Sequence, residues 1–192
     1  MRVEEVTLRA TVADHGEGPR EPFPQVAFAG RSNVGKSSLL NTLFGVRLAG
    51  ISKTPGKTRT INYYLVNGSC YFVDLPGYGF ARTGRERREA WGERITSYIE
   101  GEQRLRLVVG LIDPGIPTSP LDVELVRFVR AVGTQLLLVM TKTDRLGRGE
   151  LARAGQRLTR DLDSGTPPLA FSARTGAGRK DVLATIAHAL AA

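Results

Sequence analysis

The sequence predicts a three-layer α/β fold, in which a mostly parallel sheet carries helices on both faces. Two observations lead to this prediction. From residue 25 onward, short apolar runs alternate with longer segments of helical periodicity, as repeated strand–helix units require. Polar and glycine-rich motifs follow the apolar runs, at the carboxyl ends of the expected strands, where such folds bind their ligands. The length of 192 residues suits one domain.

The expected elements follow in chain order. Residues 1–12 alternate in polarity and can form an edge strand, and residues 14–24 have the glycines and prolines of a loop. The turn Asn67-Gly68 between two apolar runs is a strong hairpin signal. The other expected strands are Gln25 to Ala29, Ile61 to Val66, Cys70 to Val73, Leu105 to Ile112, Gln135 to Met140 and Leu169 to Phe171. The expected helices are Ser37 to Phe44, Arg85 to Glu100, Leu121 to Val132, Arg148 to Leu162 and Gly178 to Leu190.

Residues 30–37 match the pattern G-x-x-x-x-G-K-[ST] of a phosphate-binding loop, between an expected strand and an expected helix. In such a loop the backbone N–H groups surround the phosphates, the lysine reaches the β and γ phosphates, and the final hydroxyl ligates Mg²⁺. The helix N-terminus adds free N–H groups and the positive end of its dipole. A glycine turn with an unrelated lysine is the alternative, and the flanking elements argue against it. The loop residues expected at a nucleotide are Gly30, Arg31, Ser32, Asn33, Val34, Gly35, Lys36, Ser37 and Ser38.

A second motif, Asp74-Leu75-Pro76-Gly77, follows the run that ends at Val73. In phosphate-loop enzymes a strand-end aspartate holds Mg²⁺, usually through water. The N–H group of Gly77 can contact a γ-phosphate and sense its loss. Pro-Gly also makes ordinary turns, which is the alternative. We expect all four residues at the nucleotide.

Two further motifs predict a guanine pocket. Asp144, in Thr141-Lys142-Thr143-Asp144, can accept hydrogen bonds from N1–H and the N2 amino group of guanine. Adenine lacks this pair of donors and would leave a buried carboxylate unpaired. The Lys142 stem can lie over the base. In Phe171-Ser172-Ala173, the backbone N–H group of Ala173 can contact guanine O6.

The segment Ser52 to Thr60 is polar and has few core residues. Such a segment gains little from packing, so it can order on a ligand and relax without it. A threonine in this position can supply a second Mg²⁺ ligand. The spacing leaves Thr54, Thr58 and Thr60 open as candidates.

Together these motifs closely resemble the EngB family (also called YihA or YsxC), bacterial GTP-binding proteins of ribosome assembly. The resemblance implies a P-loop NTPase G domain at residues 23–192, with residues 1–22 as an N-terminal extension. It implies that Thr58 is the threonine that binds Mg²⁺. The other ligands of the ion would be Ser37 and, through water, Asp74. It also implies a GTPase that binds the large ribosomal subunit and its rRNA, and whose loss impairs growth, division and septation. On this basis Gly56, Lys57, Thr58, Arg59 and Thr60 join the nucleotide site, and Lys36, Thr58 and Gly77 receive catalytic roles.

Three details bear on mechanism. Tyr78 stands where Ras-like enzymes carry a glutamine that orients water, so we expect slow intrinsic hydrolysis that a partner accelerates. Asn33 occupies the position at which related bacterial GTPases bind K⁺, which makes it a candidate K⁺ ligand. The family usually has Arg-His after the aspartate of Leu-Ile-Asp, whereas this chain has Asp113-Pro114-Gly115-Ile116-Pro117.

The net charge of +8 favours an anionic partner, nucleic acid first and a membrane surface second. Basic residues gather in the segment Ser52 to Thr60 and just after Gly77. Both segments are expected to respond to the γ-phosphate, so RNA affinity there would depend on the bound nucleotide. A solvated face, with arginines paired to Glu86, Glu89 and Glu93, is the alternative. The candidate RNA contacts are Lys53, Lys57, Arg59, Arg82, Arg85, Arg87 and Arg88.

Other classes are less favoured. The apolar runs are too short to span a bilayer, no leader opens the chain, and Cys70 is the single cysteine, so we expect a cytoplasmic protein without disulfides. A G domain can work alone, so we expect a monomer. A phosphate-loop ATPase or nucleotide kinase is disfavoured by Asp144 and by the lack of an arginine-rich lid. An RNA-binding module with a purely structural nucleotide site stays open.

Overall fold

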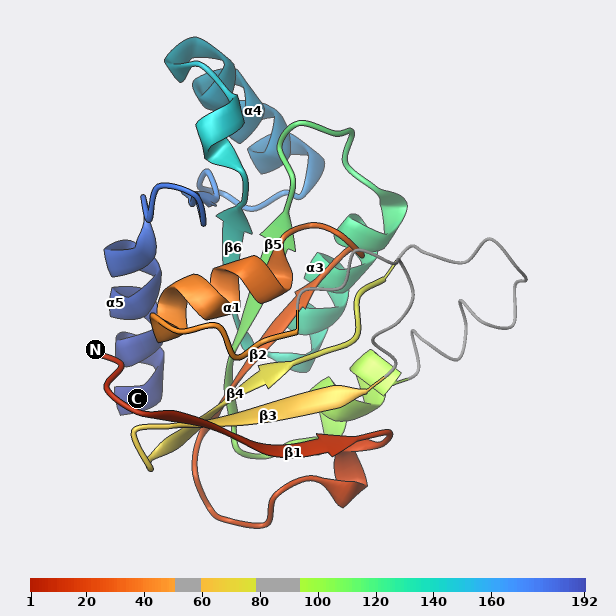
Figure 1. Cartoon of the computed structure of the whole chain (residues 1–192). Helices are drawn as coiled ribbons and strands as arrows, with labels where there is room; N and C mark the ends of the chain where they lie inside the picture. The colour runs from red at the N-terminus through yellow and green to blue at the C-terminus, as the bar shows by residue number, and fades with distance from the viewer. Residues whose placement is uncertain (51–59, 79–93) are drawn as a thin grey trace.

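A computed structural model describes residues 1–50, 60–78 and 94–192 of the chain (Figure 1). Its centre is a seven-stranded sheet with the strand order β1-β3-β4-β2-β5-β6-β7. The pairs β1–β3 and β3–β4 are antiparallel, and all other neighbours are parallel. The strands are Val6–Val12 (β1), Gln25–Gly30 (β2), Ile61–Val66 (β3), Cys70–Asp74 (β4), Leu105–Ile112 (β5), Gln135–Met140 (β6) and Leu169–Ala170 (β7).

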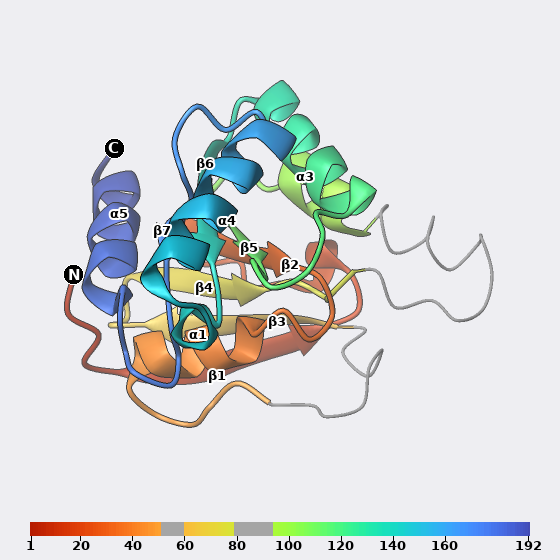
Figure 2. The same cartoon turned by 90° about the horizontal axis from the view of Figure 1, so that it is seen from above.

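Helices cover both faces of this sheet, which confirms the predicted three-layer α/β fold (Figures 1 and 2). Seen from above, α1 and α3 lie on opposite sides of the strands (Figure 2). The helices are Lys36–Phe44 (α1), Pro120–Val132 (α3), Arg148–Asp161 (α4) and Arg179–Ala191 (α5), and residues 94–101 are also helical. The expected helix Arg85 to Glu100 therefore lies partly outside the described residues.

The central strand β2 is buried along its whole length, because both of its faces carry core side chains. Val26 and Phe28 pack in the core under α1 and α5. Ala27 and Ala29 point to the other face, where the core includes Tyr98 of the 94–101 helix and residues of α3. A strand covered on both faces reads as a continuous apolar run, which is how the sequence predicted it.

The edge strand β1 is held by the β3–β4 hairpin. Asn67 and Gly68 both have positive φ, 51° and 61°, as the tight hairpin turn requires. The Asn67 side chain also binds the N-terminal segment, because its Oδ1 accepts hydrogen bonds from the N–H groups of Glu4 and Glu5. Its Nδ2 donates to the carbonyl of Arg2. The hairpin turn thus positions the first residues of the chain beside the sheet.

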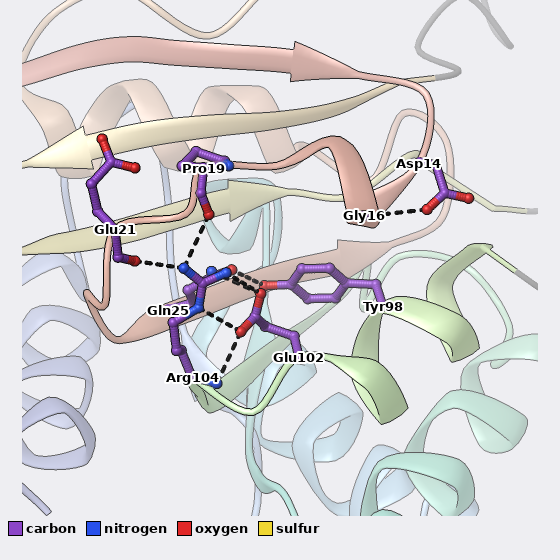
Figure 3. A network of polar contacts seen from close by, with 8 residues as sticks. All are labelled: Asp14, Gly16, Pro19, Glu21, Gln25, Tyr98, Glu102 and Arg104. Carbon is purple, nitrogen blue, oxygen red and sulfur yellow. Dashed lines mark hydrogen bonds and ion pairs between the residues drawn. The ribbon is translucent and has the colours of Figure 1, made fainter.

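A polar network lies at the amino end of the parallel strands, where β2 and β5 begin (Figure 3). We call Gln25, Tyr98, Glu102 and Arg104 the amino-end network. Tyr98 Oη donates to Gln25 Oε1 over 2.8 Å, and Gln25 Nε2 donates to Glu102 Oε2 over 3.0 Å. Glu102 also accepts two hydrogen bonds of 2.7 Å from the Arg104 guanidinium.

The amino-end network also holds the loop between β1 and β2. The Arg104 guanidinium donates to the carbonyls of Pro19 and Glu21 (Figure 3). The carboxylate of Glu102 is mostly buried, and burial alone would raise its pKa. Hydrogen bonds from Arg104 outweigh that effect and leave the pKa of Glu102 below its ordinary value. Three segments distant in sequence therefore meet at one fixed ion pair.

Candidate nucleotide-binding site

Four loops meet at the carboxyl edge of the sheet. They follow β2, β4, β6 and β7, and they carry the four motifs whose residues the structure describes. Strand β2 lies between β4 and β5, so the strand order changes direction there, and open α/β sheets bind ligands at such a point. The structure thus brings together motifs spread over the chain from Gly30 to Ala173.

The loop after β2 has the backbone shape of a phosphate cradle. Asn33 and Gly35 have φ of 63° and 107°, in the left-handed region, so the chain turns sharply before α1 begins at Lys36. Gly30 has no space for a side chain, because a Cβ there would lie 2.9 Å from Val34 Cγ1 and 3.0 Å from the carbonyl oxygen of Leu111. The two motif glycines are therefore required for different reasons, Gly30 by packing and Gly35 by its backbone angle.

Lys36 forms an ion pair with Asp74 at the base of this loop. The two residues are 8% and 3% exposed, so the pair is buried. Parallel pairing of β2 with β4 aligns Phe28 with Asp74 and brings the two motifs together. Lys36 and Asp74 were predicted to meet the phosphates and the Mg²⁺ ion, and each of them now contacts the other.

The segment after Asp74 pairs directly with the phosphate loop. The Ser32 N–H group donates to the Tyr78 carbonyl over 2.7 Å, and the Tyr78 N–H group donates to the Gly30 carbonyl over 3.2 Å. Gly77 lies so close to the loop that a Cβ there would be 3.1 Å from Ser32 Cα. Pro76 precedes this contact and Leu75 is fully buried below it. The predicted γ-phosphate sensor thus lies against the loop.

The Tyr78 side chain points away from the loop into the protein. It is 2% exposed, and its hydroxyl donates to Asp122 Oδ1 over 2.8 Å. Burial, and then the neighbouring Asp122 carboxylate, raise the pKa of Tyr78 well above its ordinary value. Asp122 also accepts from the Ser119 N–H group in the capping box that begins α3. The pattern Ser119-Pro-Leu-Asp122 signals the start of a helix, but nothing in the sequence predicted the contact between Asp122 and Tyr78.

The loop after β6 is joined to the phosphate loop by two hydrogen bonds. Thr141 Oγ1 donates to the Val34 carbonyl over 2.6 Å, and Lys142 Nζ donates to the Asn33 carbonyl over 2.8 Å. Lys142 has φ of 55° and also forms an ion pair of 2.6 Å with Asp113. Asp113 begins the segment in which this chain departs from the family pattern, so the departure leaves this ion pair in place.

Asp144 is oriented by the loop after β7. Ser172 Oγ donates to Asp144 Oδ1 over 2.7 Å, and Arg174 lies 3.9 Å from the other carboxylate oxygen. The hydrogen bond from Ser172 is the main reason why the pKa of Asp144 lies below its ordinary value. The carboxylate is therefore held ionised in a defined orientation, which suits an acceptor of two hydrogen bonds.

A glycine sets the position of that loop. Gly178 has φ of 78°, and a Cβ there would lie 2.0 Å from the Ala170 carbonyl oxygen, at the end of β7. Next in the chain, Arg179 donates to the carbonyls of Thr42 and Leu43 at the end of α1. The start of α5 thus fastens the loop beside Asp144 to the helix of the phosphate loop.

A cavity of about 690 Å³ lies between these loops and the C-terminal half of α1. Its volume is in the range of ligand sites. Seven of its lining residues are among those expected at the nucleotide from the sequence, namely Gly35, Ser38, Thr141, Lys142, Asp144, Phe171 and Ala173. The lining residues from the end of α1 and the loop after it were not expected, among them Asn41, Thr42 and Arg47. Nothing in their local pattern marks them as ligand contacts.

Several predicted residues cannot be placed. Thr54, Gly56, Lys57, Thr58 and Arg59 lie outside the described residues, and all seven candidate RNA contacts do as well. Thr60 is described and is partly exposed immediately before β3. Within the described ranges, no group of three or more histidine, cysteine or acidic side chains forms a metal cluster. No described helix has the length and apolar character needed to cross a membrane.

Comparison with known proteins agrees with the motifs. A family model described as 50S ribosome-binding GTPase matches residues 25–142. The probable GTP-binding protein EngB of Petrotoga mobilis is 41% identical over 192 residues, covering 99% of this chain and 98% of that protein. The protein of the same description from Kosmotoga olearia is 43% identical over 95% of this chain and 97% of its own length.

Solved structures agree on the fold. A crystal structure of a probable GTP-binding protein EngB has a TM-score of 0.69 at 21% identity and covers 86% of this chain and 98% of that one. Era in complex with MgGDPNP and nucleotides 1506–1542 of 16S ribosomal RNA has a TM-score of 0.67 at 23% identity, over 85% of this chain and 55% of that one. The full-length matches and the phosphate-loop fold lead to one conclusion: the chain belongs to the EngB family of GTP-binding proteins and carries a GTPase domain that hydrolyses GTP.

Proposed function

We propose that this protein is a GTP-dependent switch that binds the large ribosomal subunit and its rRNA during assembly, in the cytoplasm, and thereby supports cell division and septation. The observation that carries this proposal is the joined site at the carboxyl edge. Asp144, held by Ser172, and the phosphate loop border one cavity region, and Lys142 bonds the two halves together. The family description of a 50S ribosome-binding GTPase supports the choice of subunit.

In this proposal the two halves of the site have different tasks. Asp144, Lys142 and Ala173 bind guanine, and the residues from Gly30 to Ser38 bind the phosphates. Lys36 is the cation that neutralises charge on the β and γ phosphates, and Gly77 contacts the γ-phosphate. Residues 23–192 form the G domain. Residues 1–22 are an extension that contributes β1 to the sheet edge.

The residues present fit a Mg²⁺ ion. Mg²⁺ prefers oxygen ligands and takes few of them from the protein, the rest coming from phosphates and water. Ser37 offers a hydroxyl at the start of α1, and Asp74 offers a buried carboxylate that contacts the preceding residue, Lys36. We assign the ion to Ser37 and Thr58, with Asp74 acting through water. When bound, it would neutralise charge on the β and γ phosphates.

We propose that intrinsic hydrolysis is slow and that a partner accelerates it. The Tyr78 side chain is buried and bonded to Asp122, so it is turned away from the predicted γ-phosphate position. Asn33, which is exposed in the loop, is the proposed ligand of a K⁺ ion. Equal turnover in matched K⁺ and Na⁺ buffers would remove that ion from the proposal.

Co-sedimentation with purified ribosomal subunits tests the function. We expect the protein to pellet with large subunits in a non-hydrolysable GTP analogue, and much less with GDP or without nucleotide. The bound fraction should fall steeply as salt rises, because contacts to RNA phosphates release counterions. Asp144→Asn is the matched control, since it should lose the response to GTP without unfolding. Binding that ignores the nucleotide, or that selects small subunits, would contradict the proposal.

A further inference from the structure

Tyr78 is held both by its backbone and by its side chain. Its backbone pairs with the phosphate loop through the bonds Ser32 N–H to Tyr78 O and Tyr78 N–H to Gly30 O. Its side chain is bonded to Asp122 of α3, on a different element. Residues 77–78 are therefore fixed against the loop both by the strand-like pairing and by a buried hydrogen bond to a carboxylate.

This arrangement uses groups that a triphosphate would need. The Ser32 N–H group, one of the loop's donors, already donates to Tyr78. The Lys36 ammonium is engaged by Asp74, but both GDP and GTP have the β-phosphate that would compete for it, so this ion pair does not distinguish them. Gly77 lies against the loop as well, because a Cβ there would be 3.1 Å from Ser32 Cα. A γ-phosphate that accepts a hydrogen bond from the Ser32 N–H group would have to displace the Tyr78 carbonyl, so residues 77–78 would withdraw from the loop.

We propose that Tyr78 is a specificity-determining residue that lowers the affinity for GTP relative to GDP, because its hydroxyl bond to Asp122 stabilises the arrangement in which residues 77–78 pair with the phosphate loop. The inference rests on the proposed phosphate site. A ligand shifts an equilibrium only by its different affinity for the two arrangements. GDP lacks the γ-phosphate and tolerates the paired arrangement, whereas GTP must displace it.

The hydrogen bond between Tyr78 and Asp122 is protected from water. The hydroxyl and the carboxylate are both buried, with Tyr78 and Asp122 each 2% exposed, so water cannot easily replace either partner. The second carboxylate oxygen of Asp122 accepts from the Ser119 N–H group over 2.9 Å, which fixes the carboxylate at the start of α3. Displacement of residues 77–78 therefore changes the environment of the α3 N-terminus as well.

The test compares nucleotide affinities of the full chain. Kd for GDP and for a non-hydrolysable GTP analogue is measured in Mg²⁺ buffer for wild type, Tyr78→Phe and Asp122→Asn. Tyr78→Phe keeps the ring and removes only the hydroxyl. We expect the ratio Kd(GTP analogue)/Kd(GDP) to fall about fivefold in Tyr78→Phe, since a buried hydrogen bond to a charged group no longer opposes the GTP form. Asp122→Asn should change the ratio in the same direction and by less, because its amide oxygen still accepts.

Ser119→Ala is the matched control. It removes the hydroxyl that caps α3 by accepting from the Leu121 N–H group, but it leaves the Tyr78–Asp122 bond in place. Its ratio should stay at the wild-type value even if the melting temperature falls. An unchanged ratio in Tyr78→Phe, or an equal change in Ser119→Ala, would overturn the inference while GDP binding is intact. Failure of the wild type to bind GDP would instead show that the proposed site itself is wrong.

Discussion

Polar clusters lie at both ends of strand β2, and they differ in whether the protein alone completes them. At the amino end, Gln25 belongs to the amino-end network, in which Glu102 and Arg104 bind each other and the loop before β2. At the carboxyl end, Lys36 begins α1 and pairs with Asp74, and Asp144 lines a cavity of about 690 Å³. The first cluster is completed by the protein alone. The second borders a cavity that can hold a ligand. Strand β2 is therefore fixed by protein contacts at one end and lies beside a ligand site at the other.

The comparison predicts that Asp144→Asn mainly affects binding. Guanine loses a carboxylate that accepts from two donors, so we expect GTP affinity to fall by about a hundredfold or more, roughly 3 kcal/mol. The free energy of unfolding should change by less than about 0.5 kcal/mol, because Asp144 lies at a partly exposed loop. Isothermal titration and thermal unfolding measure the two quantities. Unchanged GTP affinity would contradict the guanine assignment.

A change at the amino end should have the opposite profile. Arg104→Ala leaves the Glu102 carboxylate without its guanidinium in a mostly buried place, so we expect a loss of about 3 kcal/mol in unfolding free energy. GTP affinity of the folded protein should stay within about twofold of wild type, since Arg104 lies at the amino end of the parallel strands and the cavity lies at their carboxyl end. Urea unfolding and nucleotide titration test this. The control is Arg2→Ala, whose ion pair with Glu4 is exposed and should contribute almost nothing.

Ser172→Ala sharpens the description of the carboxyl end. Without the Ser172 hydroxyl, the pKa of Asp144 rises and its orientation loosens, so we expect about a tenfold loss of GTP affinity at pH 7. The loss should grow as pH falls towards the pKa of Asp144, because the protonated carboxyl no longer accepts both bonds. Nucleotide titration between about pH 4.5 and 8 would check this. Ser164→Ala, which removes an exposed hydroxyl bonded to the Thr166 carbonyl, is the matched control.

The smallest expected effect is the pH dependence of the amino end. The pKa of Glu102 is lower in the folded protein than in the unfolded chain, so its ionised form stabilises the fold above about pH 4.3. That contribution is lost as the pH falls through the folded-state pKa. Glu102→Gln should therefore cost about 1 kcal/mol at neutral pH, and the difference from wild type should vanish in acid. A difference that stays constant with pH would contradict the assigned ionisation.

Sequence alone predicted the fold better than it predicted the polar contacts. The bounds expected for β5 and β6 agree with the structure, because apolar runs in a buried parallel sheet end where the loops begin. The hairpin at Asn67 was predictable because the turn needs positive φ at two adjacent residues. The strand-end positions of Asp74 and Asp144 followed from the same periodicity.

The missed features are long-range pairings of polar side chains. Tyr78 and Asp122 are 44 residues apart, and Gln25 and Glu102 are 77 residues apart. No local pattern connects such residues, since each of them also has an ordinary local interpretation. Asp122 has the appearance of a helix cap, and Glu102 and Arg104 have the appearance of charged residues between a helix and a strand. Only the packing of the sheet shows that they meet.

The bond from Arg179 to the end of α1 has a consequence for synthesis of the chain. Arg179 and Thr42 are 137 residues apart, and the core under α1 includes Val182 and Ile186 of α5. The helix that starts at the phosphate loop is therefore translated long before its partner α5. Contacts of such high sequence separation slow folding and prolong the exposure of apolar surface. In a nascent chain, the part of α1 that contacts α5 stays uncovered until α5 has been translated.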